Sequence, residues 1–376
     1  MLHREGLLKH RGLAVLAITY DGLCTETGKA YVKRFLTQRR VFYVLDEAHY
    51  IKTPGSKRTK TILASSKYAR YKRLLTGTPV AEGPFDLYSQ LRFLDENFWK
   101  YKGIGSFSGF KSEFGVFVRR EFGPRSFDQL IGYKNLEKLH GCLGEMCHRL
   151  TKEEAGLKLP PKLYSKRYIE LTPEQKRIYS SLRDDLRAEL MTGVEITTPL
   201  AIVKLLRLQQ VICGYVGDGE KILHRIEGPN PRLDATLDIL SGINHQAIVW
   251  CRFTEDIDQL TAALGSDAVR YDGTLTPDDA ALSKEKFQAG DAKVFVANTQ
   301  KGAEGLTLVG AKSAIYYSNS FRLVHREQSE NRCHRPGQTT SVLYTDLVAQ
   351  DTVDEQIVDA LQKKQDIATL ITGDRL

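Results

Sequence analysis

The sequence has little of three things: long apolar runs, cysteine and negative charge. No apolar run approaches the roughly 20 residues that a membrane-spanning helix requires, so we expect no membrane partner. The 6 cysteines are spread over 376 residues, which argues against a disulfide framework and favours a reducing compartment. The basic opening stretch MLHREGLLKHRG lacks the apolar segment of a secretory signal. We therefore expect a cytoplasmic protein in a bacterial or viral setting, with a nuclear location also open.

The shortage of acidic residues leaves the chain basic. It carries 54 lysines and arginines against 46 acidic residues, a net charge of +8, and its pI is about 9.0. A basic balance favours an acidic partner, and nucleic acid is the first candidate.

One cluster of metal-binding residue types needs separate mention. The stretch HGCLGEMCHR places His140, Cys142, Cys147 and His148 close together. Zinc sites prefer tighter cysteine pairs with a distant second pair. A buried helix that carries small thiols is the alternative, and the sequence leaves both readings open.

Short apolar runs recur along the chain and predict strands that are buried on both faces of a sheet. Helical patterns such as TEDIDQLTAAL and PDDAALSKEKFQ lie between them. This alternation predicts an α/β fold with parallel sheets and function at the carboxyl ends of the strands. The runs are residues 13–19, 41–45, 73–76, 247–251, 293–297, 314–317 and 342–348.

The runs form two groups, which predict two domains. The first group ends near Thr76 and the second begins near Ala247. Between them, Pro160 and Pro161 exclude a helix and indicate a joint. We predict a first domain over residues 1–162, including a helical insertion, and a second over 163–376 that ends in a closing helix.

Two turns in the first domain carry candidate chemistry. The apolar run VFYVL delivers Asp46 and Glu47 to the end of a strand, where one acid can hold magnesium and the other can orient water. The stretch LLTGTP, residues 74–79, ends another strand with two threonines around a glycine. A solvated acid pair and an ordinary strand-to-helix turn are the alternative readings.

Two further stretches stand out in the second domain. ANTQKGAEGLTL follows a buried run, and its Gly302 and Gly305 allow backbone amides to approach a phosphate. QSENRCHRPGQ places Arg332 and Arg335 three residues apart, on one face of a helix if the segment is helical. Two guanidinium groups projected together suit a transferring phosphate. A simple turn and a surface charge pair are the alternatives.

In this order, LDEAH, LTGTP, GAEGLTL and QSENRCHRPGQ resemble the Swi/Snf family of superfamily-two helicase-like ATPases. ITYDGL, GPFDLYSQLRFLD, LPPK before ELTPEQKRIY, IVWCRFTEDIDQL and RYDGTL are similar to further family segments, so the resemblance covers nearly the whole chain. RNA helicases with the same acidic box usually have Ser-Ala-Thr as their third motif. TGTP therefore favours the branch that translocates on double-stranded DNA.

The resemblance implies two RecA-like lobes that clasp ATP and Mg²⁺ between them. It implies that Asp46 holds the magnesium through water, that Glu47 orients the attacking water, and that Arg332 and Arg335 reach the γ-phosphate. The other implied residues are Gly302, Gly305 and Gln328 for nucleotide binding, His49, Thr76, Gly77 and Thr78 for coupling, and Thr19, Arg252, Thr299 and Lys301 for contact with the DNA backbone. Ala303, Thr307 and His148 depart from the family pattern.

The phosphate loop Gly-x-x-x-x-Gly-Lys-Ser/Thr is missing from the pattern. The nearest match, GLCTETGKA at 22–30, has the wrong spacing and places Ala30 where a hydroxyl is needed. We therefore expect the first lobe to be incomplete at its N-terminal side, with the loop supplied by an N-terminal segment or a second polypeptide. We expect the chain alone to hydrolyse ATP poorly. A non-catalytic nucleic-acid-binding or regulatory module on the same fold is the alternative function, and a strand-separating helicase ranks below both.

Overall fold

The computed structural model describes residues 4–122, 125–191, 198–217, 223–302 and 306–373. The chain forms two compact units. Unit 1 comprises Met1–His148 and Lys364–Leu376, and unit 2 comprises Arg149–Lys363. The predicted domain boundary between residues 162 and 163 stays a prediction.

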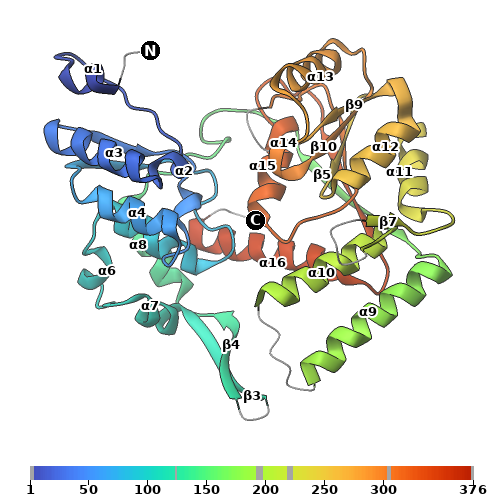
Figure 1. Ribbon diagram of the computed structural model, residues 1–376, viewed down its shortest axis with the longest axis horizontal. Coiled ribbons are helices and arrows are strands. Elements are labelled where there is room, and N and C mark those ends of the chain that lie inside the picture. Colours follow the sequence, from blue (N-terminus) through green and yellow to red (C-terminus); the bar gives the residue numbers. More distant parts are fainter. Residues whose placement is uncertain (1–3, 123–124, 192–197, 218–222, 303–305, 374–376) are drawn as a thin grey trace. The chain divides into compact units, whose positions relative to one another are not determined.

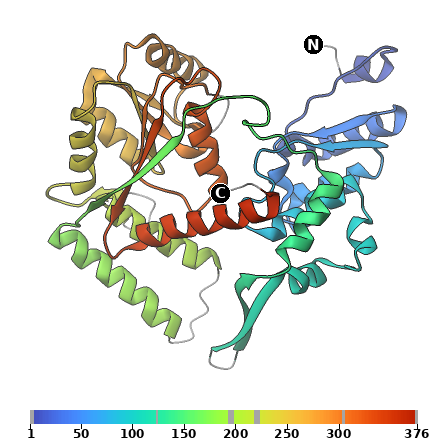
Figure 2. The same cartoon turned by 180° about the vertical axis from the view of Figure 1, so that it is seen from behind.

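Unit 2 is built on a six-stranded sheet in which every strand is parallel to its neighbours (Figures 1 and 2). This confirms the α/β class and the predicted strands of the second half. The spatial order is β5 (Lys162–Ile169), β12 (Val342–Ala349), β11 (Ser313–Tyr316), β8 (Ala247–Cys251), β10 (Val294–Asn298) and β9 (Ala268–Tyr271).

The central strand β8 shows why its sequence is a continuous apolar run. All five of its residues are buried. Ile248 and Trp250 point into one core cluster, and Val249 and Cys251 point into another. Each face of the sheet therefore has its own core, as the period of two in a strand requires. The helices of these two layers are α11 (Pro231–Ser241), α12 (Thr254–Leu264), α13 (Pro277–Ala289), α14 (Thr299–Gly302) and α15 (Leu323–Cys333).

Outside the sheet, unit 2 adds a helix pair and a small hairpin. These are α9 (Pro173–Met191), α10 (Thr198–Ile212), β6 (Tyr215–Gly217) and β7 (Leu223–Arg225). The sequence predicts how α9 begins. Thr172 Oγ1 accepts a hydrogen bond from the amide of Gln175 at 3.2 Å, and Gln175 Oε1 accepts one from the amide of Thr172 at 3.0 Å. This reciprocal pair is a capping box, which a threonine followed three residues later by glutamine favours at the start of a helix.

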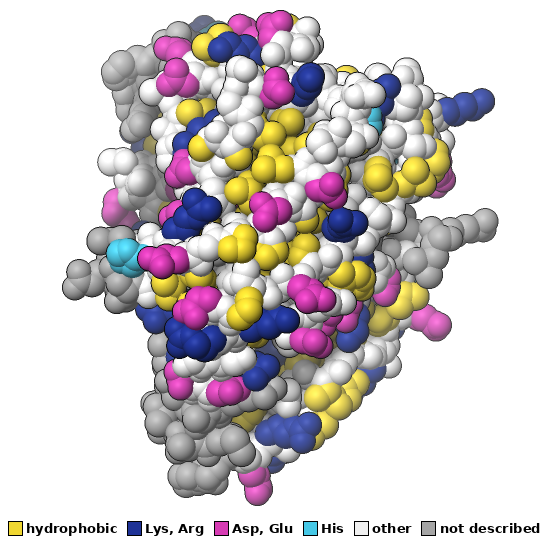
Figure 3. Space-filling model, turned by 90° about the vertical axis from the view of Figure 1, so that its right-hand side faces the viewer, with side chains coloured by type: hydrophobic (Ala, Val, Ile, Leu, Met, Phe, Trp, Pro, Cys, Tyr) yellow, Lys and Arg dark blue, Asp and Glu magenta, His cyan; other side chains and the backbone are white. Residues whose placement is uncertain are grey.

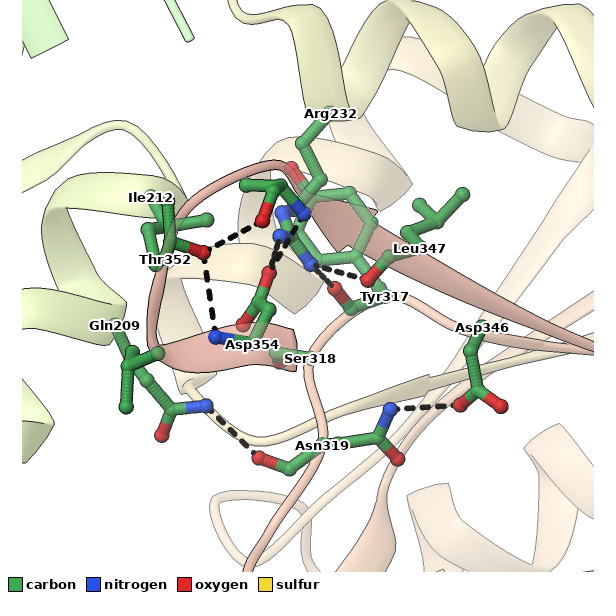
Figure 4. A network of polar contacts seen from close by, with 12 residues as sticks. Gln209, Ile212, Arg232, Tyr317, Ser318, Asn319, Asp346, Leu347, Thr352 and Asp354 are labelled. Atoms are coloured by element: carbon green, nitrogen blue, oxygen red, sulfur yellow. Dashed lines mark hydrogen bonds and ion pairs between the residues drawn. The ribbon is translucent and has the colours of Figure 1, made fainter. Parts of the chain in front are cut away.

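A buried polar network fastens α11 to the end of the sheet (Figure 4). Arg232 is 1% exposed and pairs with Asp354, and it also donates to the carbonyls of Tyr317 and Leu347. Asp354 lies near the start of α16 (Val353–Thr372). Burying this arginine is tolerated because several acceptors share its charge.

Unit 1 contains a much smaller sheet. β1 (Phe42–Leu45) and β2 (Tyr71–Leu74) form a two-stranded parallel sheet. The helices α2 (Tyr20–Leu23), α3 (Glu26–Gln38) and α4 (Lys57–Ser66) contribute to its core. The strand predicted over residues 13–19 is wrong, because that segment has no regular structure. Its Leu13 and Val15 are 92% and 77% exposed.

The predicted helical insertion follows in unit 1, and it also contains a hairpin that the sequence did not indicate. β3 (Gly115–Phe122) and β4 (Arg125–Tyr133) pair antiparallel. The helices are α5 (Leu87–Leu94), α6 (Phe98–Tyr101), α7 (Phe107–Phe114) and α8 (Leu136–Met146). The predicted closing helix is α16, and its part from Lys364 onward belongs to unit 1, where Ile371 joins the aromatic core of the insertion.

The described residues bear on three features: membrane-spanning helices, a metal site and disulfides. Among these residues, no helix is long and apolar enough to cross a membrane. No group of three or more His, Cys, Asp or Glu side chains is placed to bind a metal ion, so His140, Cys142, Cys147 and His148 form no such site there. All six cysteines lie in the described part and are free thiols.

Candidate functional site

The acidic pair lies in a tight turn directly after β1. The Asp46 side chain is exposed, and its Oδ1 accepts a hydrogen bond from the Glu47 amide at 2.9 Å. Glu47 has φ 49° and ψ 53°, a left-handed conformation that few non-glycine residues adopt. The hydroxyl of Tyr20 donates to the Asp46 carbonyl at 2.6 Å. The turn therefore projects both carboxylates from a backbone that is held on two sides.

The acidic turn and the threonine turn are joined directly. The amide of Leu75 donates to the Leu45 carbonyl at 2.8 Å, and the amide of Ala48 donates to the Leu75 carbonyl at 3.0 Å. These bonds continue the β1–β2 ladder past the ends of both strands. Parallel neighbours end at the same edge of a sheet, which is why the two turns lie together.

The predicted coupling residues lie in and beside these turns. His49 is 6% exposed, its Nδ1 lies 3.2 Å from Glu47 Oε2, and its ring contacts that of Tyr50. Thr76 Oγ1 accepts from the amide of Thr78 at 3.1 Å, which closes the turn around Gly77. The Thr78 hydroxyl is buried and has no hydrogen-bond partner in the described part of the chain.

An ion-pair cluster follows the threonine turn, and the sequence did not indicate it. Glu82 Oε1 lies 3.1 Å from Nζ of Lys52, a residue that follows the acidic turn. Glu82 also pairs with Lys364 of α16. Burial acts to raise the pKa of Glu82, but the hydrogen bond from Lys364 and the charges of both lysines outweigh it and lower that pKa. Glu82 is therefore held as a carboxylate between the two lysines.

The arginine pair lies at the end of α15 in unit 2. Arg332 Nη1 donates to the Leu306 carbonyl at 3.3 Å, and Arg335 Nη1 donates to the same carbonyl at 2.9 Å. Arg335 also donates to Thr307 Oγ1 at 3.0 Å. Gln328, one turn earlier, accepts from Arg332 Nε through its carbonyl at 3.2 Å. The structure thus brings the two predicted arginines together against the segment that follows α14.

Arg326, which the sequence analysis did not predict as a site residue, helps to fix the orientation of α15. Arg326 is nearly buried, pairs with Glu330 and Asp346, and its guanidinium lies 3.6 Å from the centre of the Tyr316 ring. Burial acts to lower the pKa of Arg326, but the neighbouring Tyr316, Asp346 and Glu330 raise it overall, so the charge is secure. The i,i+4 spacing of Arg326 and Glu330 was the available signal.

The residues predicted to contact DNA differ in exposure and in their hydrogen-bond partners. Arg252 is bonded to Gln209, and burial lowers its pKa. Thr299 is 4% exposed, and its hydroxyl donates to the Cys251 carbonyl at 3.2 Å. Thr19 is exposed and caps α2 through the amide of Gly22. These contacts give each residue a structural role, and their contact with DNA stays a prediction.

The remaining candidates fall at the limits of the described chain. Gly302 ends α14, and of Lys301 only the backbone, within that helix, is described. Gly305 lies outside the described residues. The acidic pair belongs to unit 1 and the arginine pair to unit 2, and their convergence on one nucleotide stays a prediction.

The chain is similar to known families, curated proteins and solved structures. Residues 7–214 match the family described as the SNF2-related domain, and residues 231–337 match the helicase conserved C-terminal domain. An uncharacterized ATP-dependent helicase of Mycoplasma pneumoniae is 26% identical over 94% of this chain and 32% of its own length. The DNA annealing helicase and endonuclease ZRANB3 of Mus musculus is 25% identical over 95% of this chain and 32% of its own length.

The chain thus spans about a third of the length of the curated relatives that it matches. Among solved structures, the Sulfolobus solfataricus SWI2/SNF2 ATPase core in complex with dsDNA is 22% identical. That match covers 92% of this chain and 72% of the other, with a TM-score of 0.45.

Proposed function

Because the chain belongs to the family of the SNF2-related domain, we propose that it is the ATPase core of an ATP-dependent translocase of double-stranded DNA. The observation that carries the proposal is the direct joining of the acidic turn to the threonine turn through Ala48 and Leu75. That joining lets a change at the acidic pair reach the threonines. A motor needs such a link between its nucleotide site and the groups that respond to it.

In unit 1, Asp46 would hold Mg²⁺ through water and Glu47 would orient the attacking water. The residues fit the ion, since Mg²⁺ keeps several waters and binds one or two carboxylates, and the Asp46 carboxylate is exposed beyond the strand. The ion supplies charge neutralisation for the phosphates of ATP. His49, 3.2 Å from Glu47, would sense the state of that carboxylate.

In unit 2, Arg332 and Arg335 would bind the γ-phosphate of ATP. Both guanidinium groups now share the Leu306 carbonyl, a neutral acceptor. A phosphate oxygen is a stronger acceptor for arginine than a carbonyl, so the pair would exchange this contact for the nucleotide. Gln328 and the glycines of residues 302–305 would lie beside the same phosphates.

The DNA partner would be held by its phosphates without reading of bases. A net charge of +8 supports binding to a polyanion. On the side of the molecule in Figure 3, basic and acidic side chains are interspersed around groups of hydrophobic ones, so the described residues of this face present charge of both signs. The basic contacts would therefore come from local loops such as that of Arg252.

The sheet of unit 1 supports our proposal that a further segment completes the nucleotide site. Its two strands leave Phe42 57%, Val44 40% and Tyr71 46% exposed. Isolated two-stranded sheets are marginal in water, and exposed apolar sheet residues indicate a missing covering layer. A strand–loop–helix segment that carries Gly-x-x-x-x-Gly-Lys-Ser/Thr would both pair with this sheet and bind the β- and γ-phosphates.

The test compares ATP hydrolysis by the chain alone and by the chain preceded by its upstream coding sequence, each with and without duplex DNA. We expect near-background hydrolysis from the chain alone and DNA-stimulated hydrolysis from the longer form. Glu47→Gln in the longer form should abolish turnover and preserve DNA binding. DNA-stimulated turnover of about one per second or more from the chain alone would disprove the missing-segment proposal.

The rival function makes a different prediction. A non-catalytic DNA-binding or regulatory module would bind duplex DNA with the same affinity in the presence and absence of ATP. A translocase core would change its DNA affinity when ATP is bound. Equal affinities in the longer form, measured by fluorescence anisotropy, would overturn the motor and favour the module.

A further inference from the structure

The segment between residues 151 and 161 is attached to the end of α15 that carries the arginine pair. Lys152 Nζ donates to the His334 carbonyl at 2.6 Å and to Asn331 Oδ1 at 2.8 Å. At the other end of the segment, the Pro160 carbonyl lies 2.8 Å from His334 Nε2. Both ends of the segment therefore hold the same terminus of one helix.

These contacts alternate with the arginines along the chain. Asn331 immediately precedes Arg332, and His334 immediately precedes Arg335. A lysine at this position also complements the negative end of the α15 dipole. Releasing Lys152 would loosen the two residues that directly adjoin the arginines.

The charges that face Lys152 are mostly positive. Burial, together with the charges of Lys162 on β5 and Arg335 after α15, lowers the pKa of Lys152 from 10.5 to about 8, and the charge of Glu330 opposes this shift. Burial also lowers the pKa of His334, which is therefore neutral above pH 7. A new negative charge beside Arg335 would relieve the crowding of positive charge.

We propose that Lys152 is a positioning residue whose attachment to the end of α15 tightens when Arg332 and Arg335 hold a polyphosphate and loosens when they release it. The segment 151–161 would then report the occupancy of the arginine pair to the rest of the chain. This inference rests on the proposed role of the two arginines.

The pH dependence has a definite sign. Lys152 has a pKa of about 8 when attached, below its ordinary value of 10.5, so attachment releases a proton and strengthens as pH rises from about 8 toward 10.5. A bound anion raises the attached pKa. Its effect is therefore largest below pH 8 and fades where Lys152 is neutral in both states.

Trypsin cleavage after Lys158 measures the attachment, since Lys158 is exposed in the middle of the segment. With pyrophosphate as the probe at pH 7.5, we expect cleavage of the unaltered chain to slow several-fold. Lys152→Gln should speed basal cleavage about tenfold, because it removes the charge-assisted hydrogen bonds to Asn331 and His334, and should abolish the response to pyrophosphate. Lys152→Arg should retain the response. Lys166→Gln, which removes an exposed charge from β5, should behave as the unaltered chain.

Calorimetric titration of pyrophosphate tests the role of the arginine pair separately from the role of Lys152. Binding that is lost in Arg335→Gln supports the arginine role. If pyrophosphate binds in that way but cleavage after Lys158 does not change, the Lys152 inference is overturned while the arginine role stands. If Arg335→Gln binds pyrophosphate unchanged, the arginine role itself fails. A Lys152→Arg variant that responds no better than Lys152→Gln would show that charge is not the link, and would also overturn the inference.

Discussion

The two parallel sheets of the described chain have opposite surroundings. In unit 2, β8 is buried along its whole length between two cores, and β10 and β11 flank it in the six-stranded sheet. Among the described residues of unit 1, β1 pairs with β2 alone, and Phe42 and Val44 are exposed. Parallel sheets normally have both faces covered. The difference is one of burial: the described residues cover both faces of the unit 2 sheet, whereas apolar residues of β1 in unit 1 stay exposed.

The two units also differ in how deeply they bury an ion pair between arginine and aspartate. Unit 2 buries the Arg232–Asp354 pair with side chains 1% and 6% exposed, while the Arg58–Asp21 pair of unit 1 has an aspartate that is 83% exposed. Buried pairs are costly to break, and exposed pairs contribute little. Stability should therefore be distributed unequally between the units.

The largest effect is expected at Arg232. Arg232→Met leaves Asp354 buried without its partner and should destabilise unit 2 by about 3–5 kcal/mol. Amide hydrogen exchange, which follows each unit separately, measures the loss. Arg177→Met removes an exposed arginine of the same unit, paired with Glu174, and serves as the control. A loss at Arg232 no larger than at Arg177 would contradict the locked core of unit 2.

Matching substitutions in the two sheets should differ almost as much. Ile248→Ala in β8 should cost about 2–5 kcal/mol, because Ile248 is fully buried and a cavity remains. Val44→Ala in β1 should cost less than about 0.5 kcal/mol, because Val44 is 40% exposed. Chemical denaturation of both variants tests the contrast. Equal costs would mean that the exposed face of β1 is covered in solution by the chain itself.

The stability of unit 2 should also depend on pH, with a smaller effect than the two substitutions above. Burial raises the pKa of Asp256 from 3.8 to about 7, and Ser318 and Arg232 only partly oppose this. The folded state therefore binds a proton that the unfolded state has lost between pH 4 and 7, so unit 2 should lose stability as pH rises through that window. Asp256→Asn should flatten the dependence of Tm on pH. Part of it should remain, since burial also raises the pKa of Glu327 to about 7. An unchanged slope would contradict the assignment to Asp256.

The smallest effect is expected at the exposed pair of unit 1. Arg58→Gln should change the free energy of unfolding by about 0–1 kcal/mol, and less at high salt. Arg58 also lies 5.2 Å from the Tyr50 ring, so Arg58→Lys, which retains the charge, is the matched control. A loss above about 2 kcal/mol, measured by urea denaturation, would show that unit 1 is more tightly held here than its exposure suggests.

The sequence predicted four strands of the unit 2 sheet, β8, β10, β11 and β12, because they are continuous apolar runs between helical patterns. It did not predict β5 and β9, because polar and charged residues interrupt them. The same rule failed over residues 13–19, where the run is apolar but pairs with no strand in the described chain. The β3–β4 hairpin was missed because Arg119, Arg120 and Asp128 interrupt its apolar pattern.

The site residues that belong to short motifs could be predicted from the sequence. The contacts that depend on the tertiary fold could not. Asp46 and Thr76 belong to such motifs, and they lie together because parallel strands end at one edge. The pairing of Arg232 with Asp354, or of Lys152 with His334, joins residues 122 and 182 positions apart. No local pattern specifies such a contact, because it depends on how the sheet is closed and covered.

The left-handed backbone of Glu47 limits which substitutions can remove its carboxylate without changing the turn. At φ 49°, a side chain branched at Cβ would collide with its own main chain, so valine or threonine would reshape the turn as well as delete the acid. Glutamine makes the same steric demand as glutamate and removes only the charge. Glycine would relax the turn and could detach Ala48 from Leu75, so a null phenotype from that variant would not identify the lost carboxylate as its cause.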